Sequence, residues 1–209
     1  MHNQDILIHT FKSQTLRDVV NSATEFFIKT PVESFPPGSR FNGGGVYALY
    51  FMGEFELYSG LALTSVQEDS IPIYVGKAVP SGWRTARKST SSGTPLFNRI
   101  NEHYRNIEHV NNLSVADFKC RYMVLDEDES GIIGPVEANL IRQFQPLWNT
   151  VIDGFGNHTP GEGRFNQAKS GWDVLHPGRS WAERCKGRSQ VSEDIVKKIN
   201  LYMIKRAKI

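Results

Sequence analysis

Short apolar runs bounded by turn-forming residues predict the strands of this chain. These runs are rich in β-branched and aromatic side chains, which is typical of buried strands. They cover residues 45–51, 71–78 and 119–125, and a short return strand is expected at 55–58. In the first two runs a tyrosine stands two positions from a glycine: Tyr47 follows Gly45, and Tyr74 precedes Gly76. Because glycine gives up side-chain packing, a glycine at a strand end indicates that another group approaches the backbone closely.

Apolar residues at helical spacing predict four helices. They cover residues 13–30 and 96–110, a segment that opens at 134–135 and a segment that opens at 192. Ser13 and Ser192 are the expected N-caps. Arg99 and His103, four residues apart, share one face of the second helix. Glu137 is expected in the first turn of the third helix beside its apolar stripe, where a carboxylate needs a partner or a metal.

Composition divides the chain into three parts. They are an N-terminal helical arm at 1–43, a core at 44–149 with a polar insertion at about 79–95, and a C-terminal extension at 150–209 that is irregular and ends in a helix. We expect the apolar face of the arm to dock on the core or on a second subunit. Trp172 and Trp181 lie with arginine and histidine in Gly- and Pro-rich segments, which favours a binding surface over a core.

The composition is typical of a globular protein: of 209 residues, 39% are hydrophobic and 22% are charged. No apolar run approaches the roughly 20 residues needed to span a bilayer, and the first residues lack the pattern of a signal peptide. No membrane partner is therefore expected. Cys120 and Cys185 have no metal-ligand spacing, so we expect reduced thiols in the cytoplasm.

Charge is unevenly distributed, although the net charge is only +2. From residue 161 to 209, eleven Lys and Arg residues stand against five Asp and Glu, and the acidic block 126–129 offsets part of this excess. A basic segment is often only a solvated surface, but it also suits contact with phosphate groups. Nucleic acid is therefore a candidate partner.

Five motifs, in a fixed order, resemble the signature of the GIY-YIG nuclease superfamily. They are Gly45-Val46-Tyr47, Tyr74-Val75-Gly76, Leu96-Phe97-Asn98-Arg99-Ile100-Asn101-Glu102-His103-Tyr104, Pro135-Val136-Glu137 and Pro146-Leu147-Trp148-Asn149. The resemblance covers residues 44–149. It implies an α+β fold with a small three-stranded antiparallel sheet flanked by helices. Valine replaces isoleucine in both tripeptides, which is a conservative change for strand packing.

The resemblance implies catalytic roles for five of these residues. Tyr47 would activate a water molecule, and Tyr74 would help to position water or phosphate. Arg99 has the planar fork that grips phosphate oxygens, and His103 would hydrogen-bond a tyrosine hydroxyl or the phosphate. Glu137 would bind Mg²⁺ or Mn²⁺, and a single carboxylate is sufficient because Mg²⁺ keeps most of its waters.

Several of these residues could instead have a purely structural or solvent-exposed role. Helical glutamates and arginines are often only surface residues, and a first-turn glutamate favours the helix dipole. Lys77 would relay protons or contact phosphate, or is simply solvated, and Asn149 would brace the metal-binding helix or its glutamate. The insertion precedes the arginine helix, so Arg84 and Arg87 are alternatives to Arg99. We prefer Arg99 because only it lies in the Leu-x-x-Arg-x-x-x-His pattern.

The arm, the insertion and the extension resemble type II restriction endonucleases that cut a GC-rich six-base-pair palindrome such as CCGCGG, in host defence by restriction-modification in bacteria. This resemblance implies Mg-dependent hydrolysis of double-stranded DNA by a homodimer, without an organic cofactor. Guanine recognition favours arginine and lysine in the major groove. The candidates are Arg84, Arg87, Lys88, Arg164, Lys169 and Arg179. A structure-specific repair nuclease and a non-catalytic DNA-binding protein on the same scaffold are the alternatives.

Overall fold

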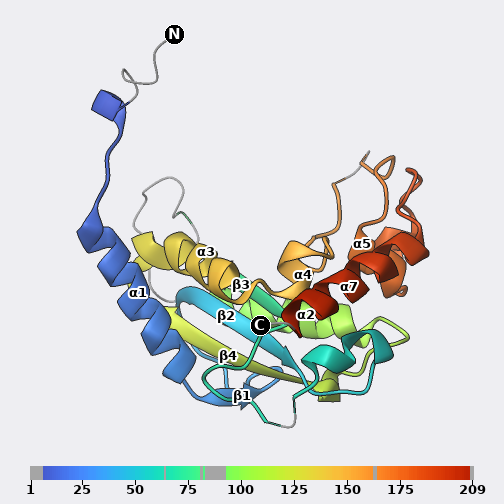
Figure 1. Cartoon of the computed structure of the whole chain (residues 1–209), viewed down its shortest axis with the longest axis horizontal. Helices are drawn as coiled ribbons and strands as arrows, with labels where there is room; N and C mark the ends of the chain where they lie inside the picture. The colour runs from blue at the N-terminus through green and yellow to red at the C-terminus, as the bar shows by residue number, and fades with distance from the viewer. Residues whose placement is uncertain (1–6, 64, 81, 83–92, 162–163, 208–209) are drawn as a thin grey trace.

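The computed structural model describes residues 7–63, 65–80, 82, 93–161 and 164–207. Within them an antiparallel sheet is flanked by helices (Figure 1). The strands are β1 (Val32–Ser34), β2 (Gly44–Phe51), β3 (Tyr74–Ala78) and β4 (Phe118–Leu125). The α-helices are α1 (Gln14–Lys29), α2 (Pro95–Glu108), α3 (Ile133–Phe144), α4 (Leu147–Thr150), α5 (Gly171–Leu175), α6 (Ser180–Glu183) and α7 (Ser192–Arg206). Short 3₁₀ helices are η1 (Leu7–His9), η2 (Glu56–Leu61), η4 (Val115–Asp117) and η5 (Ser130–Ile132).

The sheet has the strand order β1-β4-β2-β3, and each neighbouring pair is antiparallel. The structure therefore has one strand more than the three-stranded sheet that was predicted. The additional strand, β1, has only three residues and follows Pro31, so it carries no alternating pattern to detect. The edge strand β3 begins at Tyr74 and not at residue 71, because Pro72 has no N–H for a neighbouring strand. The predicted return strand at 55–58 is wrong, since this segment enters the 3₁₀ helix η2.

The four predicted helices are confirmed, with small shifts at their starts. Ser13 caps α1, and its hydroxyl accepts a hydrogen bond from the N–H of Leu16 at 3.1 Å. Helix α3 begins at Ile133, so Glu137 lies in the second turn and not, as predicted, in the first. Ser192 is the first residue of α7 and not its cap. In the part of the chain that the structure describes, no helix has the length and apolar character to cross a membrane.

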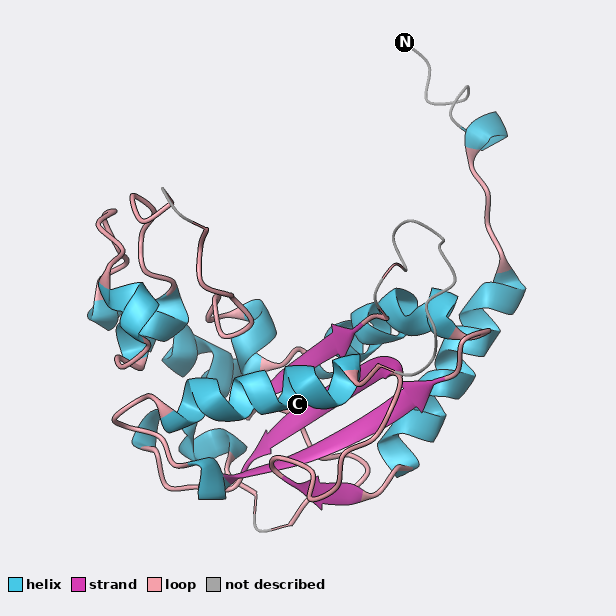
Figure 2. Ribbon diagram, turned by 180° about the vertical axis from the view of Figure 1, so that it is seen from behind, coloured by secondary structure: helices cyan, strands magenta, loops and turns pink. Residues whose placement is uncertain are grey.

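The sheet separates two apolar clusters, because alternate side chains of β2 point to opposite faces. Tyr47, Leu49 and Phe51 pack with α2 and the C-terminal extension, whereas the intervening residues pack with α1 and α3. In both views α1 lies beside α3, and α5 lies at the opposite end of the molecule (Figures 1 and 2). Helix α7 runs from α5 toward the end of α3, where Tyr202 donates a hydrogen bond to the carbonyl oxygen of Gln145 at 2.8 Å. Trp172 belongs to the first cluster and is fully buried, so the prediction that it forms a binding surface is wrong. Trp181 is half-buried.

Gly45 occupies β2 between β3 and β4, where a Cβ atom would overlap the carbonyl oxygen of Met123 in β4. We expect Gly45→Ala to lower the free energy of unfolding by about 2 kcal/mol. For a chain of this size, thermal denaturation would then show a Tm lower by about 4–8 °C. Gly131→Ala is the matched control and is expected to be neutral, because a Cβ there meets open space. Equal Tm values for the two variants would contradict this account of the β2–β4 contact.

Candidate active site

The two motif tyrosines lie side by side on the sheet face that α2 covers. Tyr47 pairs across the β2–β3 ladder with Gly76, and its ring centroid is 6.1 Å from that of Tyr74. A Cβ atom on Gly76 would lie 2.6 Å from Cζ of Tyr47. The absence of a side chain at this position therefore allows the Tyr47 ring to lie against the backbone of β3. This is the close approach that the glycine pattern predicted.

Helix α2 adds His103 to the tyrosine pair. Its ring centroid lies 5.6 Å from that of Tyr47 and 5.2 Å from that of Tyr74. The ring is fully buried, and neither nitrogen has a hydrogen-bond partner among the described residues. Burial, and then the positive charge of Arg99, hold the pKa of His103 well below its usual range. His103 is therefore a neutral imidazole with an acceptor nitrogen to offer.

The Tyr47 hydroxyl is also buried without a well-formed hydrogen bond in the described part of the chain. Burial raises the pKa of Tyr47 well above its usual value, the neighbouring Tyr74 adds to the rise, and the charge of Arg99 opposes it. Burial also raises the pKa of Tyr74, where Arg99 opposes the rise and Glu137 adds to it. A buried polar group without a partner costs folding free energy, so the buried hydroxyl of Tyr47 calls for a functional explanation.

Glu137 and Lys77 lie around the edge of β3, on the face that α3 covers. Because strand residues alternate, Lys77 points away from the face of Tyr74 and Gly76, and its Nζ lies 2.5 Å from Oε2 of Glu137. The Glu137 side chain is 19% exposed. It was predicted to need a partner or a metal, and its partner in this structure is Lys77. The site thus wraps around one edge strand.

The donor set at Glu137 fits a hard divalent cation. A carboxylate that solvent can reach is the ligand type that Mg²⁺ and Mn²⁺ prefer. The described residues contain no group of three or more His, Cys, Asp or Glu side chains arranged to hold a metal. A cation bound here would therefore keep most of its coordination sphere as water.

Asn149 braces the strand that carries Tyr74. Its side-chain oxygen accepts from the N–H of Val75 at 2.8 Å, and its amide group donates to the carbonyl oxygen of Val75 at 2.8 Å. The prediction that Asn149 supports the metal-binding helix or its glutamate is wrong in its target. The amide instead takes the place of a neighbouring strand on the free edge of β3.

Residues 155–158 of the C-terminal extension cover the site. Phe155 stacks on His103, with a centroid separation of 4.4 Å and an interplanar angle of 20°. Arg99 donates to the carbonyl oxygen of Gly156 at 2.6 Å and bonds the ring of His158 at 2.9 Å. No sequence motif predicts this contact, and its only signal is the Gly-rich stretch after Asn149.

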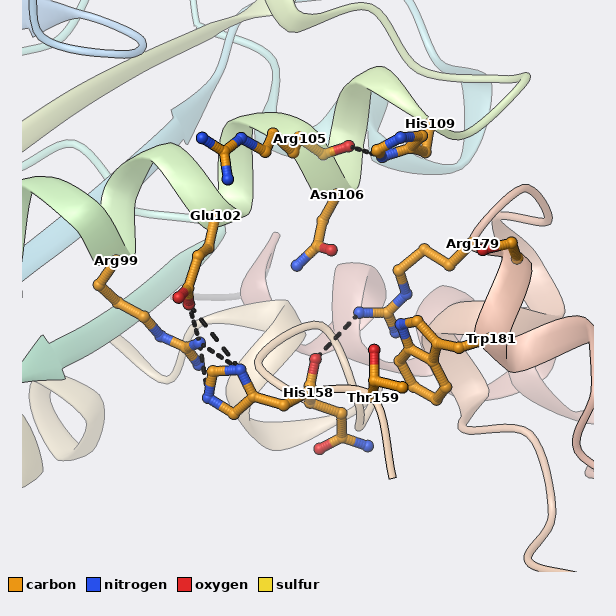
Figure 3. Close-up of a pocket in the computed structure, with 11 residues that line it drawn as sticks. Arg99, Glu102, Arg105, Asn106, His109, His158, Thr159, Arg179 and Trp181 are labelled. Atoms are coloured by element: carbon orange, nitrogen blue, oxygen red, sulfur yellow. Dashed lines mark hydrogen bonds and ion pairs between the residues drawn. The ribbon is translucent and has the colours of Figure 1, made fainter. Parts of the chain in front are cut away.

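Arg99 is held by its own chain in this structure. In addition to its contacts with 155–158, its guanidinium forms an ion pair with Glu102 at 2.7 Å, and Figure 3 shows Arg99, Glu102 and His158 directed toward one another. The Arg99 side chain is 17% exposed. Its position beside both tyrosines fits the choice of Arg99, whereas the alternatives Arg84 and Arg87 lie outside the described residues.

The predicted DNA-contacting residues have different environments. Lys88, like Arg84 and Arg87, lies outside the described residues. Arg164 is exposed, and Lys169 forms an ion pair with Glu183 at 2.5 Å. Neither environment tests whether Arg164 and Lys169 contact DNA, so both contacts stay predictions.

Arg179 does not fit the predicted role of reading bases. It is 3% exposed, forms an ion pair with Asp173 at 2.6 Å, and donates to the carbonyl oxygens of Gly154, Phe155 and Asn157. Its guanidinium also lies 4.6 Å from the centroid of the Trp172 ring. A basic residue in a Gly-rich segment suggested an exposed contact, but this arginine holds the extension together.

A family model described as the Eco29kI GIY-YIG domain matches residues 39–203. The match covers well over half of the chain. It contains all the predicted site residues, and it continues past Asn149 into the C-terminal extension. No curated protein matches the chain.

The unpartnered hydroxyl of Tyr47 generates a stability prediction. We expect Tyr47→Phe to leave the free energy of unfolding unchanged or to raise it by about 1 kcal/mol, because the variant buries one polar group fewer. Tyr58→Phe is the matched control, since the hydroxyl of Tyr58 bonds His176 at 2.5 Å and Trp148 at 3.0 Å. We expect this control to lose about 1–3 kcal/mol in chemical denaturation. A loss of that size in Tyr47→Phe would show that its hydroxyl has a structural partner.

Proposed function

Because the chain belongs to the Eco29kI GIY-YIG family, a family of restriction-type nucleases, we propose that it is a type II restriction endonuclease. It hydrolyses phosphodiester bonds of double-stranded DNA at a short GC-rich palindrome, such as CCGCGG, with Mg²⁺ or Mn²⁺ as cofactor. Its biological role is host defence by restriction-modification, in the bacterial cytoplasm. The observation that carries this proposal is the cluster of Tyr47, Tyr74, Arg99 and His103, with Glu137 around the edge of β3.

The buried tyrosine and histidine supply the proton chemistry of the proposed reaction. A tyrosine with its pKa near 10 is a weak base, and burial raises the pKa of Tyr47 further. The charge of Arg99 opposes that rise and stabilises negative charge on the hydroxyl oxygen. The ring centroid of His103 lies 5.6 Å from that of Tyr47, and burial and the charge of Arg99 lower the pKa of His103. In this scheme the negative charge of the bound DNA opposes that lowering, so that His103 accepts the proton of Tyr47. Tyr47 then orients and deprotonates the attacking water.

Arg99 binds the scissile phosphate in this scheme. Its guanidinium exchanges the Gly156 carbonyl oxygen and the His158 ring for two phosphate oxygens, which a planar fork can grip together. Tyr74, beside Arg99, positions the same phosphate or the water. The segment 155–158 must therefore shift when DNA enters, whereas the tyrosine pair stays fixed in the sheet.

Glu137 is the residue that would hold the divalent cation, and Lys77 is its neighbour. A divalent cation held by Glu137 would supply positive charge for the developing phosphorane and the leaving oxygen. The ion pair of Lys77 with Glu137 keeps a cationic group at this position when the metal is absent. Lys77 would be free to contact phosphate if the carboxylate of Glu137 held a metal.

A homodimer follows from a palindromic site, because each half-site then meets the same protein surface. Helix α1 supports this part of the proposal. Val20 and Phe27 are buried toward the core, but Leu16, Val19 and Phe26 are 47%, 44% and 63% exposed. An apolar stripe that the core leaves uncovered suits contact with a second copy of the chain.

The proposal is tested by incubating plasmid DNA with the protein, with and without Mg²⁺. We expect discrete fragments that require the metal, and a rate at least about 100-fold lower for Glu137→Gln. Glu54→Gln, which removes the same charge from an exposed residue, is the matched control and is expected to cut normally. The ends of the fragments define the recognition site.

Other results would contradict the proposal in distinguishable ways. Tight DNA binding without cleavage would place the chain among non-catalytic DNA-binding proteins. Cleavage of branched DNA alone would indicate a structure-specific repair nuclease. Undiminished cleavage by Glu137→Gln would remove Glu137 from the site.

A further inference from the structure

A cavity of about 320 Å³ lies next to Arg99, between α2 and the C-terminal extension (Figure 3). Helix α2 contributes Arg99, Glu102 and Arg105 to one wall, and the extension contributes His158 and Trp181 to the other. The cavity therefore shares a wall with the candidate active site without containing Tyr47 or Tyr74. We call it the Arg105 pocket.

Arg105 carries the uncompensated charge of this pocket. Arg99 has Glu102 as a partner at 2.7 Å, and Arg179 has Asp173 at 2.6 Å. Arg105 is exposed, and its guanidinium forms no hydrogen bond or ion pair within the described part of the chain. Because Glu102 is already neutralised, the wall has a positive charge to offer to a ligand.

The remaining polar groups of the pocket wall are neutral. They are the amide and hydroxyl groups of Asn106, Asn157, Thr159 and Ser180, and the ring of His109 lines the pocket beside them. Amide and hydroxyl groups donate hydrogen bonds readily, and a guanidinium binds phosphate oxygens in a charge-assisted manner. A wall with one unpaired arginine and several neutral donors suits a phosphate group better than a base or an apolar side chain.

The spacing along α2 matches a DNA strand. Arg105 follows Arg99 by six residues, which is a rise of about 9 Å along the helix axis. A strand of duplex DNA carries one phosphate for roughly every 3.4 Å of duplex axis. Where α2 runs beside the strand, Arg105 therefore meets a phosphate two or three nucleotides from the one that Arg99 holds.

We propose that the Arg105 pocket binds a backbone phosphate of the cleaved strand, two or three nucleotides from the scissile bond. This inference rests on the proposed nuclease function and deepens it. Arg105 is a binding residue, which aligns the strand on α2 and takes no part in hydrolysis. Its contact is independent of base sequence, because it is made to the backbone.

The first test measures DNA binding in the Glu137→Gln background, in which cleavage is suppressed. We expect Arg105→Gln to weaken binding about tenfold for cognate and mismatched duplexes alike. The slope of log Kd against log salt should fall by about one for each protomer bound. Arg17→Gln is the matched control, because Arg17 is an exposed arginine on α1, at the other end of the molecule from α5.

The second test locates the phosphate. Neutral methylphosphonates replace the phosphates of the cleaved strand one at a time, and binding is measured for the protein with and without Arg105→Gln. We expect one position, two or three nucleotides from the scissile bond, to weaken binding about tenfold when Arg105 is present and to have no further effect in the variant.

The outcomes separate this proposal from the proposed function. Only the pocket proposal fails if the wild-type protein cuts DNA and the Glu137→Gln protein binds it, but Arg105→Gln matches Arg17→Gln in affinity and salt slope. It also fails if every methylphosphonate position weakens the variant as much as the parent. If the parent neither binds nor cuts DNA, the nuclease proposal fails first and this one with it.

Discussion

The contact between the Tyr47 ring and the bare backbone of Gly76 is the constraint on which the candidate site depends. It lets the ring lie against the neighbouring strand, where a side chain at Gly76 would collide with it. The Tyr74 ring and the His103 ring then close around Tyr47. The resulting aromatic cluster buries the hydroxyl of Tyr47 and both nitrogens of His103, and these atoms have no hydrogen-bond partner among the described residues.

The edge position of β3 explains how so small a sheet brings different chemistries together. One face of the strand presents Tyr74 toward α2, and the other presents Lys77 toward Glu137 of α3. If β3 lay in the middle of the sheet, strands on both sides of it would separate Tyr74 from the Lys77–Glu137 pair. Asn149 pairs with the backbone of Val75, so the strand stays ordered although no strand of the described residues lies beyond it.

The sequence was most informative where a pattern repeats or a motif is long. Apolar runs rich in β-branched and aromatic residues predicted β2 and β4, and helical spacing predicted α1. The motifs predicted that Tyr47, Tyr74, Arg99 and His103 would meet. It was least informative where a contact joins distant segments of irregular backbone. Gly-rich composition does not reveal that residues 155–158 fold back over α2, or that Arg179 and Trp172 are buried there. A three-residue strand such as β1 also leaves no period to read.

The most direct test of the central claim is the single-turnover rate at which Tyr47→Phe cleaves cognate DNA in Mg²⁺. The variant removes one oxygen atom and leaves the ring packing on Gly76 in place. If the hydroxyl activates the attacking water, the rate should fall by about 100-fold or more, with DNA affinity unchanged. Cleavage at the wild-type rate would contradict the account, because the aromatic cluster would then be only a core.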